Sequence, residues 1–108
     1  MILKIDTTKT EGITVEFFDE KTKKTKRILE KQKVGSQVLL PMIVKILKSN
    51  KSAFQDISSI EVNPGPGSFT GTRIGVSVAN ILGFALNIPV NGKKQNIVIP
   101  KYEKSKFD

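Results

Sequence analysis

Residues 63–71 read Asn63-Pro64-Gly65-Pro66-Gly67-Ser68-Phe69-Thr70-Gly71, and a strongly apolar stretch follows as far as Leu86. The prolines and glycines enforce a tight turn, and Ser68 is placed to cap a helix that we predict over residues 68–87. Apolar side chains leave this helix almost no polar face, so it must be buried on most sides. A small domain cannot bury one helix all round. One face must therefore meet a second helix of the chain or another chain.

Small residues recur along the same predicted helix at intervals of four, namely Gly71, Gly75, Ala79 and Gly83. Each glycine inside a helix costs up to about 1 kcal/mol relative to alanine, so the stripe needs a reason. A stripe of this kind lets a neighbouring backbone approach closely. Two interpretations are open from the sequence: packing against the chain's own sheet, and contact with another subunit.

The rest of the chain predicts an α/β domain. Apolar and polar residues alternate in each clear strand, whereas helices on both sheet faces would produce continuous apolar runs. We therefore predict a mixed five-stranded sheet with two main helices on one face, and with Lys4 and Glu16 unburied on the other. The expected strands are 2–6, 13–19, 24–30, 58–63 and a short one at 88–91, with the option of one more at 97–99, and the other helix spans 36–49 and contains Pro41.

The composition limits the classes of function. A chain of 108 residues predicts one domain, which we place at residues 1–92, followed by a short basic tail at 93–108. The chain has no cysteine and no histidine, which excludes disulfides, thiolate metal sites and the commonest general base. We expect no apolar run long enough to span a bilayer and see no signal-peptide pattern. These features predict a soluble cytoplasmic protein.

The net charge of +8 arises from 18 lysines and arginines against 10 acidic residues, and only Arg27 and Arg73 are arginine. The excess gathers in residues 20–33 and in the tail. An excess made of lysine is more often a solvated surface than a specific site, because arginine is the residue suited to bidentate contacts. Long-range attraction to an acidic partner or to RNA stays open. A basic tRNA-binding module is therefore one alternative function.

Two short segments could carry chemistry. The backbone N–H groups of the Gly65–Gly71 loop could bind an anion at the helix start, although the loop lacks the Lys-Ser/Thr of a Walker motif. Asp6-Thr7-Thr8 could hold a phosphate after the first strand, but is more often an ordinary turn. We expect no catalytic pair and no metal site. The candidates for a nucleotide-binding or hydrolysing remnant, a second alternative, are Asp6, Thr7, Thr8, Gly67 and Ser68.

Three segments resemble, in order, the TsaB (YeaZ) family: residues 1–8, residues 36–43 with Pro41, and residues 63–90 with the glycine-proline turn. The resemblance implies an actin-like, ribonuclease-H-like (ASKHA) lobe, of which the family normally has two. Residues 99–102, Ile-Pro-Lys-Tyr, are similar to the family's Pro-x-Tyr ending, so we expect a chain reduced to the first lobe. Gly35 stands where the family usually has histidine.

The resemblance also implies a function. The family works in forming threonylcarbamoyladenosine in tRNA, as a non-catalytic subunit that pairs with a TsaD-like catalytic subunit and a TsaE-like ATPase. It implies no cofactor of the chain's own, ATP or ADP only within the complex, indirect contact with tRNA, no membrane, and a homodimer as an alternative to the heterodimer. Pairing in the family uses the first two helices, so the expected interface residues are Leu39, Met42, Ile43, Ile46, Ile74, Gly75, Val78, Ile81 and Leu82.

Overall fold

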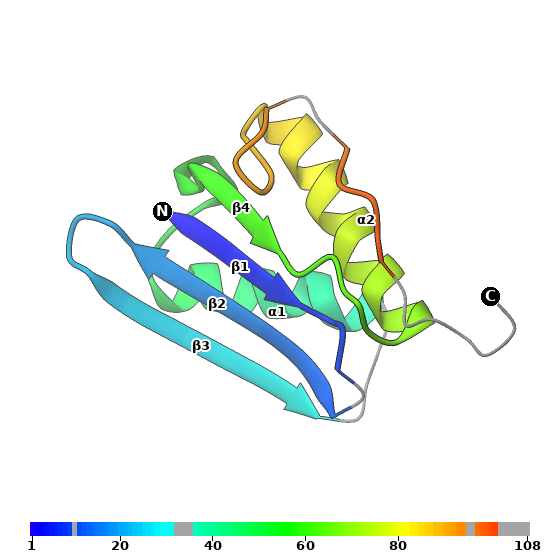
Figure 1. Ribbon diagram of the computed structural model, residues 1–108. Helices are drawn as coiled ribbons and strands as arrows, with labels where there is room; N and C mark the ends of the chain where they lie inside the picture. The colour runs from blue at the N-terminus through cyan, green and yellow to red at the C-terminus, as the bar shows by residue number, and fades with distance from the viewer. Residues whose placement is uncertain (10, 32–35, 95–96, 102–108) are drawn as a thin grey trace, which may run out of the picture.

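The computed structural model describes residues 1–9, 11–31, 36–94 and 97–101, and shows a sheet with helices packed against it (Figure 1). Three strands in sequence form an antiparallel meander, and the fourth pairs parallel to the first, giving the order β3-β2-β1-β4. The elements are β1 Ile2–Asp6, β2 Gly12–Asp19, β3 Lys24–Lys31, α1 Ser36–Ser49, the short 3-10 helix η1 Phe54–Asp56, β4 Ser59–Val62 and α2 Phe69–Leu86.

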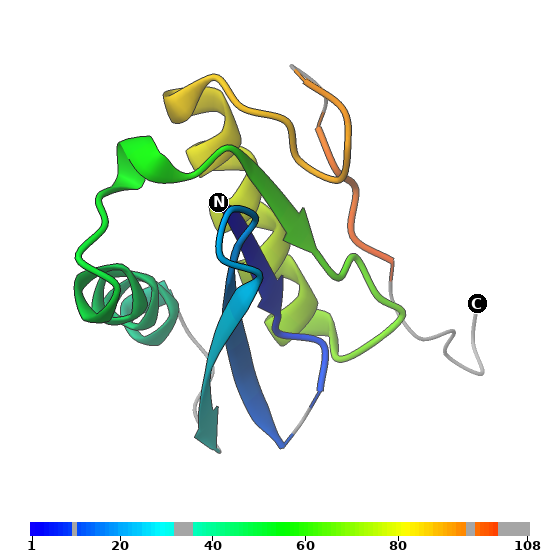
Figure 2. The same cartoon turned by 90° about the vertical axis from the view of Figure 1, so that its left-hand side faces the viewer.

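The register of the strands separates an apolar face from a polar one. Leu3 lies between Phe17 and Ile60, and all three side chains are buried. One residue further on, Lys4 lies between Glu16 and Glu61 on the opposite face, with its side chain 44% exposed. Figure 2 shows α1 wholly on one side of the strands. The predicted two-layer arrangement is confirmed, because the period of two in each strand sends every second side chain into one core.

That core joins the sheet to both helices. It contains Leu39, Ile43 and Ile46 of α1, and Val76 and Ala79 of α2, packed against the apolar sheet face. Pro41 lies inside α1 on its exposed side, and the helix continues through it to Ser49. The two helices also contact each other. The core therefore spans the whole described sheet with helices on only one of its faces.

The predicted fifth strand is wrong: four strands form the sheet in the residues described. Residues 88–91 contribute only isolated bridges, in which Val90 pairs parallel to Ile60 and antiparallel to Lys93. Pro89 has no N–H to extend the ladder, and Asn91 has a φ of 52°, which turns the chain away. Residues 97–99 form no strand either. Instead, the side-chain amide of Asn80 on α2 bonds both the N–H and the C=O of Val98, at 3.0 and 2.9 Å.

The outer edge of β4 is covered by the same returning segment. The N–H of Ile60 donates to Pro89 O at 3.0 Å, and its C=O accepts from the N–H of Asn91 at 2.8 Å. The side-chain amide of Asn91 then bonds both backbone groups of Val62, at 2.8 and 3.0 Å. One asparagine side chain thus completes the backbone pairing that the missing strand would have supplied.

The small residues of α2 pack against the chain itself. A Cβ on Gly71 or Gly75 would overlap Thr7, at the end of β1, and one on Gly83 would overlap Val90. Gly71, Gly75, Ala79 and Gly83 are all buried. Of the two interpretations of the stripe, packing against the chain's own sheet is the one observed.

By length and composition α2 is a helix that could cross a membrane, with 18 residues and a mean hydropathy of 1.3. A helix packed in a protein core passes the same test, so this finding does not contradict the expectation of no membrane-spanning run. The apolar content has another physical source here, because one side of α2 is buried against the sheet. The opposite side carries Thr70, Arg73 and Ser77, all exposed.

Candidate functional site

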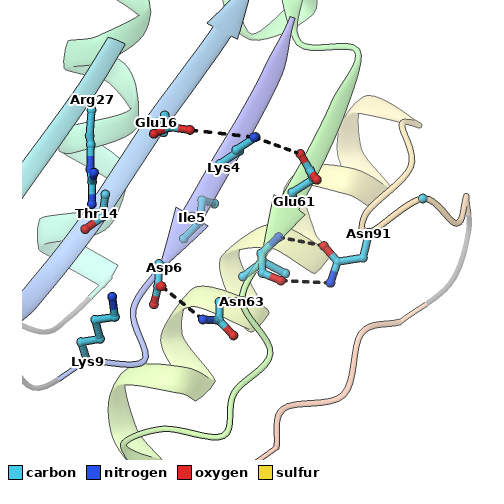
Figure 3. Close-up of a pocket in the computed structure, with 12 residues that line it drawn as sticks. Lys4, Ile5, Asp6, Lys9, Thr14, Glu16, Arg27, Glu61, Asn63 and Asn91 are labelled. Carbon is cyan, nitrogen blue, oxygen red and sulfur yellow. Dashed lines mark hydrogen bonds and ion pairs between the residues drawn. The ribbon is translucent and has the colours of Figure 1, made fainter. Parts of the chain in front are cut away.

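The turn before α2 folds back onto the end of β1, which brings the predicted anion-site residues together around Asp6, the one of them that Figure 3 labels. Ser68 N–H donates to Thr8 O at 3.0 Å, and Gly67 packs so closely on Thr8 that a Cβ would overlap it. The buried hydroxyl of Thr7 donates to Gly71 O at 2.5 Å. Two segments sixty residues apart in the sequence are therefore joined at one point, where β1 ends and α2 begins.

Asp6 lies at the centre of this junction. Its Oδ1 accepts from the Thr8 N–H at 2.9 Å and from the Thr8 hydroxyl at 2.7 Å, and its Oδ2 accepts from Asn63 Nδ2 at 3.1 Å. Burial alone would raise the pKa of Asp6, but the hydrogen bonds from Thr8 and Asn63 outweigh it and hold that pKa below the ordinary 3.8. Both carboxylate oxygens are thus engaged in holding the turn.

This geometry predicts a contribution of Asp6 to stability at low pH. A carboxyl whose pKa is depressed by folding stabilises the fold above its unfolded pKa, and this stabilisation is lost as the pH falls through the folded value. The free energy of unfolding should therefore fall below about pH 4 partly through Asp6. In urea titrations across this range, Asp6→Asn should show a shallower loss than the unaltered chain. Identical pH profiles would mean that Asp6 makes no such contribution.

A polar hollow of about 750 Å³ opens beside Asp6 on the uncovered face of the sheet. Lys4 forms ion pairs there with Glu16 at 3.9 Å and Glu61 at 3.8 Å, while Lys9 and Arg27 also line it (Figure 3). Its charges are mixed, and within the described ranges no group of three or more acidic, histidine or cysteine side chains could hold a metal ion. The arrangement suits a turn fixed by its own polar groups. An anion or nucleotide site at Asp6, Thr7, Thr8, Gly67 and Ser68 stays a prediction.

The predicted interface residues divide into two groups. Leu39, Met42, Ile43 and Ile46 of α1 are buried in the core, as are Gly75 and Val78 of α2. Their side chains therefore offer little exposed surface to a partner in the isolated chain. Ile74 and Leu82 are half-buried, and Ile81 is 66% exposed. Of the predicted set, these three residues of α2 expose the most surface, and the interface itself stays a prediction.

Two aromatic residues extend this exposed surface and were missed by the sequence reasoning. Phe84 is 89% exposed one turn beyond Ile81, and Phe69 is 57% exposed at the helix start, where the Arg73 guanidinium lies 5.3 Å from its ring centre. Positions 77, 81 and 84 lie on one side of a helix at three- and four-residue spacing. Combined with the glycine stripe, this spacing could have identified the exposed side, because it lies opposite the small residues. Ile74, Ile81 and Phe84 lie on this exposed side, and we call these three residues the α2 apolar face.

Comparison with known proteins gives a family for this arrangement. The family described as TsaD, tRNA N6-adenosine threonylcarbamoyltransferase, matches residues 30–94, more than half of the chain. The solved structure of YeaZ from Pseudomonas aeruginosa superposes on 82% of this chain with a TM-score of 0.76 and 33% identity. The chain belongs to the TsaD family, in its TsaB (YeaZ) branch.

Curated TsaB proteins, named for tRNA threonylcarbamoyladenosine biosynthesis, agree with this assignment. The protein of Buchnera aphidicola subsp. Baizongia pistaciae is 47% identical over 51 residues, and that of Bacillus subtilis is 44% identical over 52 residues. These matches cover 47% and 48% of this chain but 23% of each relative, and the YeaZ match covers 41% of that structure. The chain therefore spans less than half the length of its TsaB relatives.

Proposed function

We propose that this chain is a non-catalytic subunit in the formation of threonylcarbamoyladenosine in tRNA, and that it binds a TsaD-like catalytic subunit as a heterodimer. The α2 apolar face is the observation that carries the proposal. Ile81 and Phe84 are 66% and 89% exposed on a helix whose other side is already packed. Large apolar side chains grouped on a small domain are typical of an interaction site.

The kinds of side chain on the α2 apolar face also support a protein–protein interface. Buried aromatic and aliphatic side chains near the centre of an interface carry most of its binding energy. Phe84 is the most exposed apolar side chain of α2, and Ile81 lies beside it, one turn earlier on the same side of the helix. A helix of a related subunit packed against this face would bury Ile81 and Phe84 together with Ser77, which lies between them on the same side of α2.

A scaffold role agrees with the state of Asp6. Asp6 is the carboxylate among the candidates for a nucleotide-binding remnant, and both of its oxygens already accept hydrogen bonds from Thr8 and Asn63. We propose that ATP or ADP and a TsaE-like ATPase act only within the assembled complex, in the cytoplasm, where tRNA is modified. The α2 apolar face would contact tRNA only indirectly, through the catalytic subunit that it binds.

Co-purification with the TsaD-like subunit of the same organism tests the proposal. Ile81→Asp should weaken the complex by about thirty-fold or more, since a charge placed in an apolar contact costs about 2 kcal/mol at an interface hot spot. Thr22→Asp is the matched control, because it adds the same charge at an exposed hairpin position away from α2. Circular dichroism of both variants establishes that each is folded.

Two outcomes would contradict this function. The first is a complex that forms equally well with Ile81→Asp, and the second is no complex with the folded, unaltered chain. Sedimentation velocity of the chain alone then tests whether it forms a homodimer instead. If the chain dimerises and Ile81→Asp makes it monomeric, a second copy covers the α2 apolar face in place of the TsaD-like partner.

A further inference from the structure

Lysines from two separate elements meet at one end of the molecule. Lys21, Lys23, Lys24 and Lys26 belong to the β2–β3 turn and the start of β3, and all four are exposed. Lys26 Nζ reaches the carbonyl oxygen of Ser49 at 3.5 Å, at the last residue of α1. Figure 1 shows this hairpin turn and the end of α1 on the same side of the molecule, and Figure 2 presents that side to the viewer.

The last turns of α1 contribute further positive charge. Lys45 and Lys48 are three residues apart on the exposed side of the helix, so their side chains are neighbours. The helix C-terminus carries partial negative charge, which favours Lys26 and Lys48 there. We call Lys21, Lys23, Lys24, Lys26, Lys45 and Lys48 the lysine end.

None of these six ammonium groups forms an ion pair with a carboxylate in the described part of the chain. The ion pairs found there involve Lys4 and the N-terminal amine. Of the carboxylates near the lysine end, Glu20 binds the Ser58 hydroxyl and the N-terminus, and the charge of Lys23 also helps to lower the pKa of Glu20. Asp56 accepts from the Ala53 N–H. Asp19 accepts from the backbone N–H of Lys21. The excess positive charge of this surface is therefore not matched by local ion pairs.

We infer that the lysine end binds the phosphate backbone of RNA. Lys24 and Lys26 follow one side of an extended strand about 7 Å apart, so the surface presents point charges in a row. Lysine contacts phosphates as a point charge without reading sequence, whereas specific base contacts favour arginine. A polyanion with regularly spaced charge satisfies several unpaired lysines at once. An acidic protein would need carboxylates placed individually against each of them.

The choice of tRNA as the RNA rests on the proposed function, but the binding surface does not. It also lies on a different part of the molecule from the α2 apolar face. Binding to RNA can therefore be measured with the chain alone, without a partner subunit. If the chain does not bind RNA, the proposed complex with a TsaD-like subunit is not contradicted. If that complex does not form, RNA binding by the lysine end is not contradicted.

Fluorescence anisotropy with labelled bacterial tRNA tests the inference. Lys24→Glu/Lys48→Glu should weaken binding ten-fold or more at low salt, because it reverses one charge on each of the two elements. The matched control is Lys93→Glu/Lys94→Glu, which makes the same change in net charge at exposed positions after α2. The control should change the affinity less than three-fold. Lys26 is left unaltered, because it also contacts the end of α1.

Salt dependence supplies the second measurement. Each phosphate contact adds about 0.7–0.9 to the slope of log affinity against log salt concentration. The slope should therefore fall by about 1.4–1.8 in Lys24→Glu/Lys48→Glu, which removes two contacts, and hardly change in the control. Equal weakening in both variants, or no binding of tRNA by the unaltered chain at low salt, would overturn the inference. Competition by poly-glutamate as strong as that by tRNA at equal charge would assign the surface to an acidic protein instead.

Discussion

Gly75→Val is expected to lower the free energy of unfolding by about 3 kcal/mol or more. A Cβ at this position would overlap the side chain of Thr7. Overpacking of a core typically costs about 1–3 kcal/mol. Thr7 is also buried and donates its hydroxyl to Gly71 O, so moving it leaves polar groups unpaired, at a further cost of about 1–3 kcal/mol. Urea denaturation of the chain alone measures the change.

Ser77→Val provides the matched comparison for this prediction. Ser77 lies half a turn beyond Gly75 on the exposed side of α2, so the same side chain is introduced into the same helix facing water. Its effect should stay within about 0.5 kcal/mol. If instead Gly75→Val left the isolated chain stable and disrupted only a complex, the glycine stripe would be a subunit contact. The contact between α2 and β1 described above would then be wrong.

Ile43→Ala is expected to destabilise the isolated chain by about 2–5 kcal/mol, the range for removing a buried isoleucine side chain. Ile43 is fully buried between α1 and the sheet. A domain of this length has a total stability of about 5–15 kcal/mol, so the loss is a large fraction of it. Thermal and urea unfolding of the purified variant measure the effect without any partner present.

Ile81→Ala removes the same atoms from an exposed position. Because Ile81 is 66% exposed, the stability of the isolated chain should change by less than about 0.5 kcal/mol. The family resemblance implies that both Ile43 and Ile81 are interface residues. The two variants show which of them instead stabilises the core. A stable Ile43→Ala chain that fails only to bind its partner would show that α1 faces outward.

Most of the fold could be predicted from the sequence, because alternation in the strands and spacing in the helices are local signals. The predicted strand at 2–6 and helix at 36–49 match β1 and α1, and the other main elements agree within one or two residues. The single apolar face of each strand also predicted correctly which side the helices cover. These predictions depend only on residues that are close to one another in the sequence.

The errors lie where a distant residue decides the structure. Ile97-Val98-Ile99 is β-branched and apolar, as a strand would be, but the Asn80 side chain takes the backbone groups that strand pairing would use. The glycine stripe did not show whether its neighbour was Thr7 or another chain. For the interface, the apolar residues of α2 alone gave little contrast between its sides, and only the position opposite the glycine stripe marks the exposed one. The predicted interface therefore left out exposed Phe84 and included buried Ile43, and it stays a prediction.

The covering of β4 by Pro89–Asn91 has a consequence for aggregation. An open sheet edge is a template on which strands of other molecules can add, and proteins usually block it. On β4 the outward N–H and C=O groups of Ile60 and Val62 are all bonded already. The opposite edge, β3, is guarded by charged side chains, including Lys24 and Lys26. The sheet thus resists fibril-like growth at both margins, even though its polar face has no covering helix.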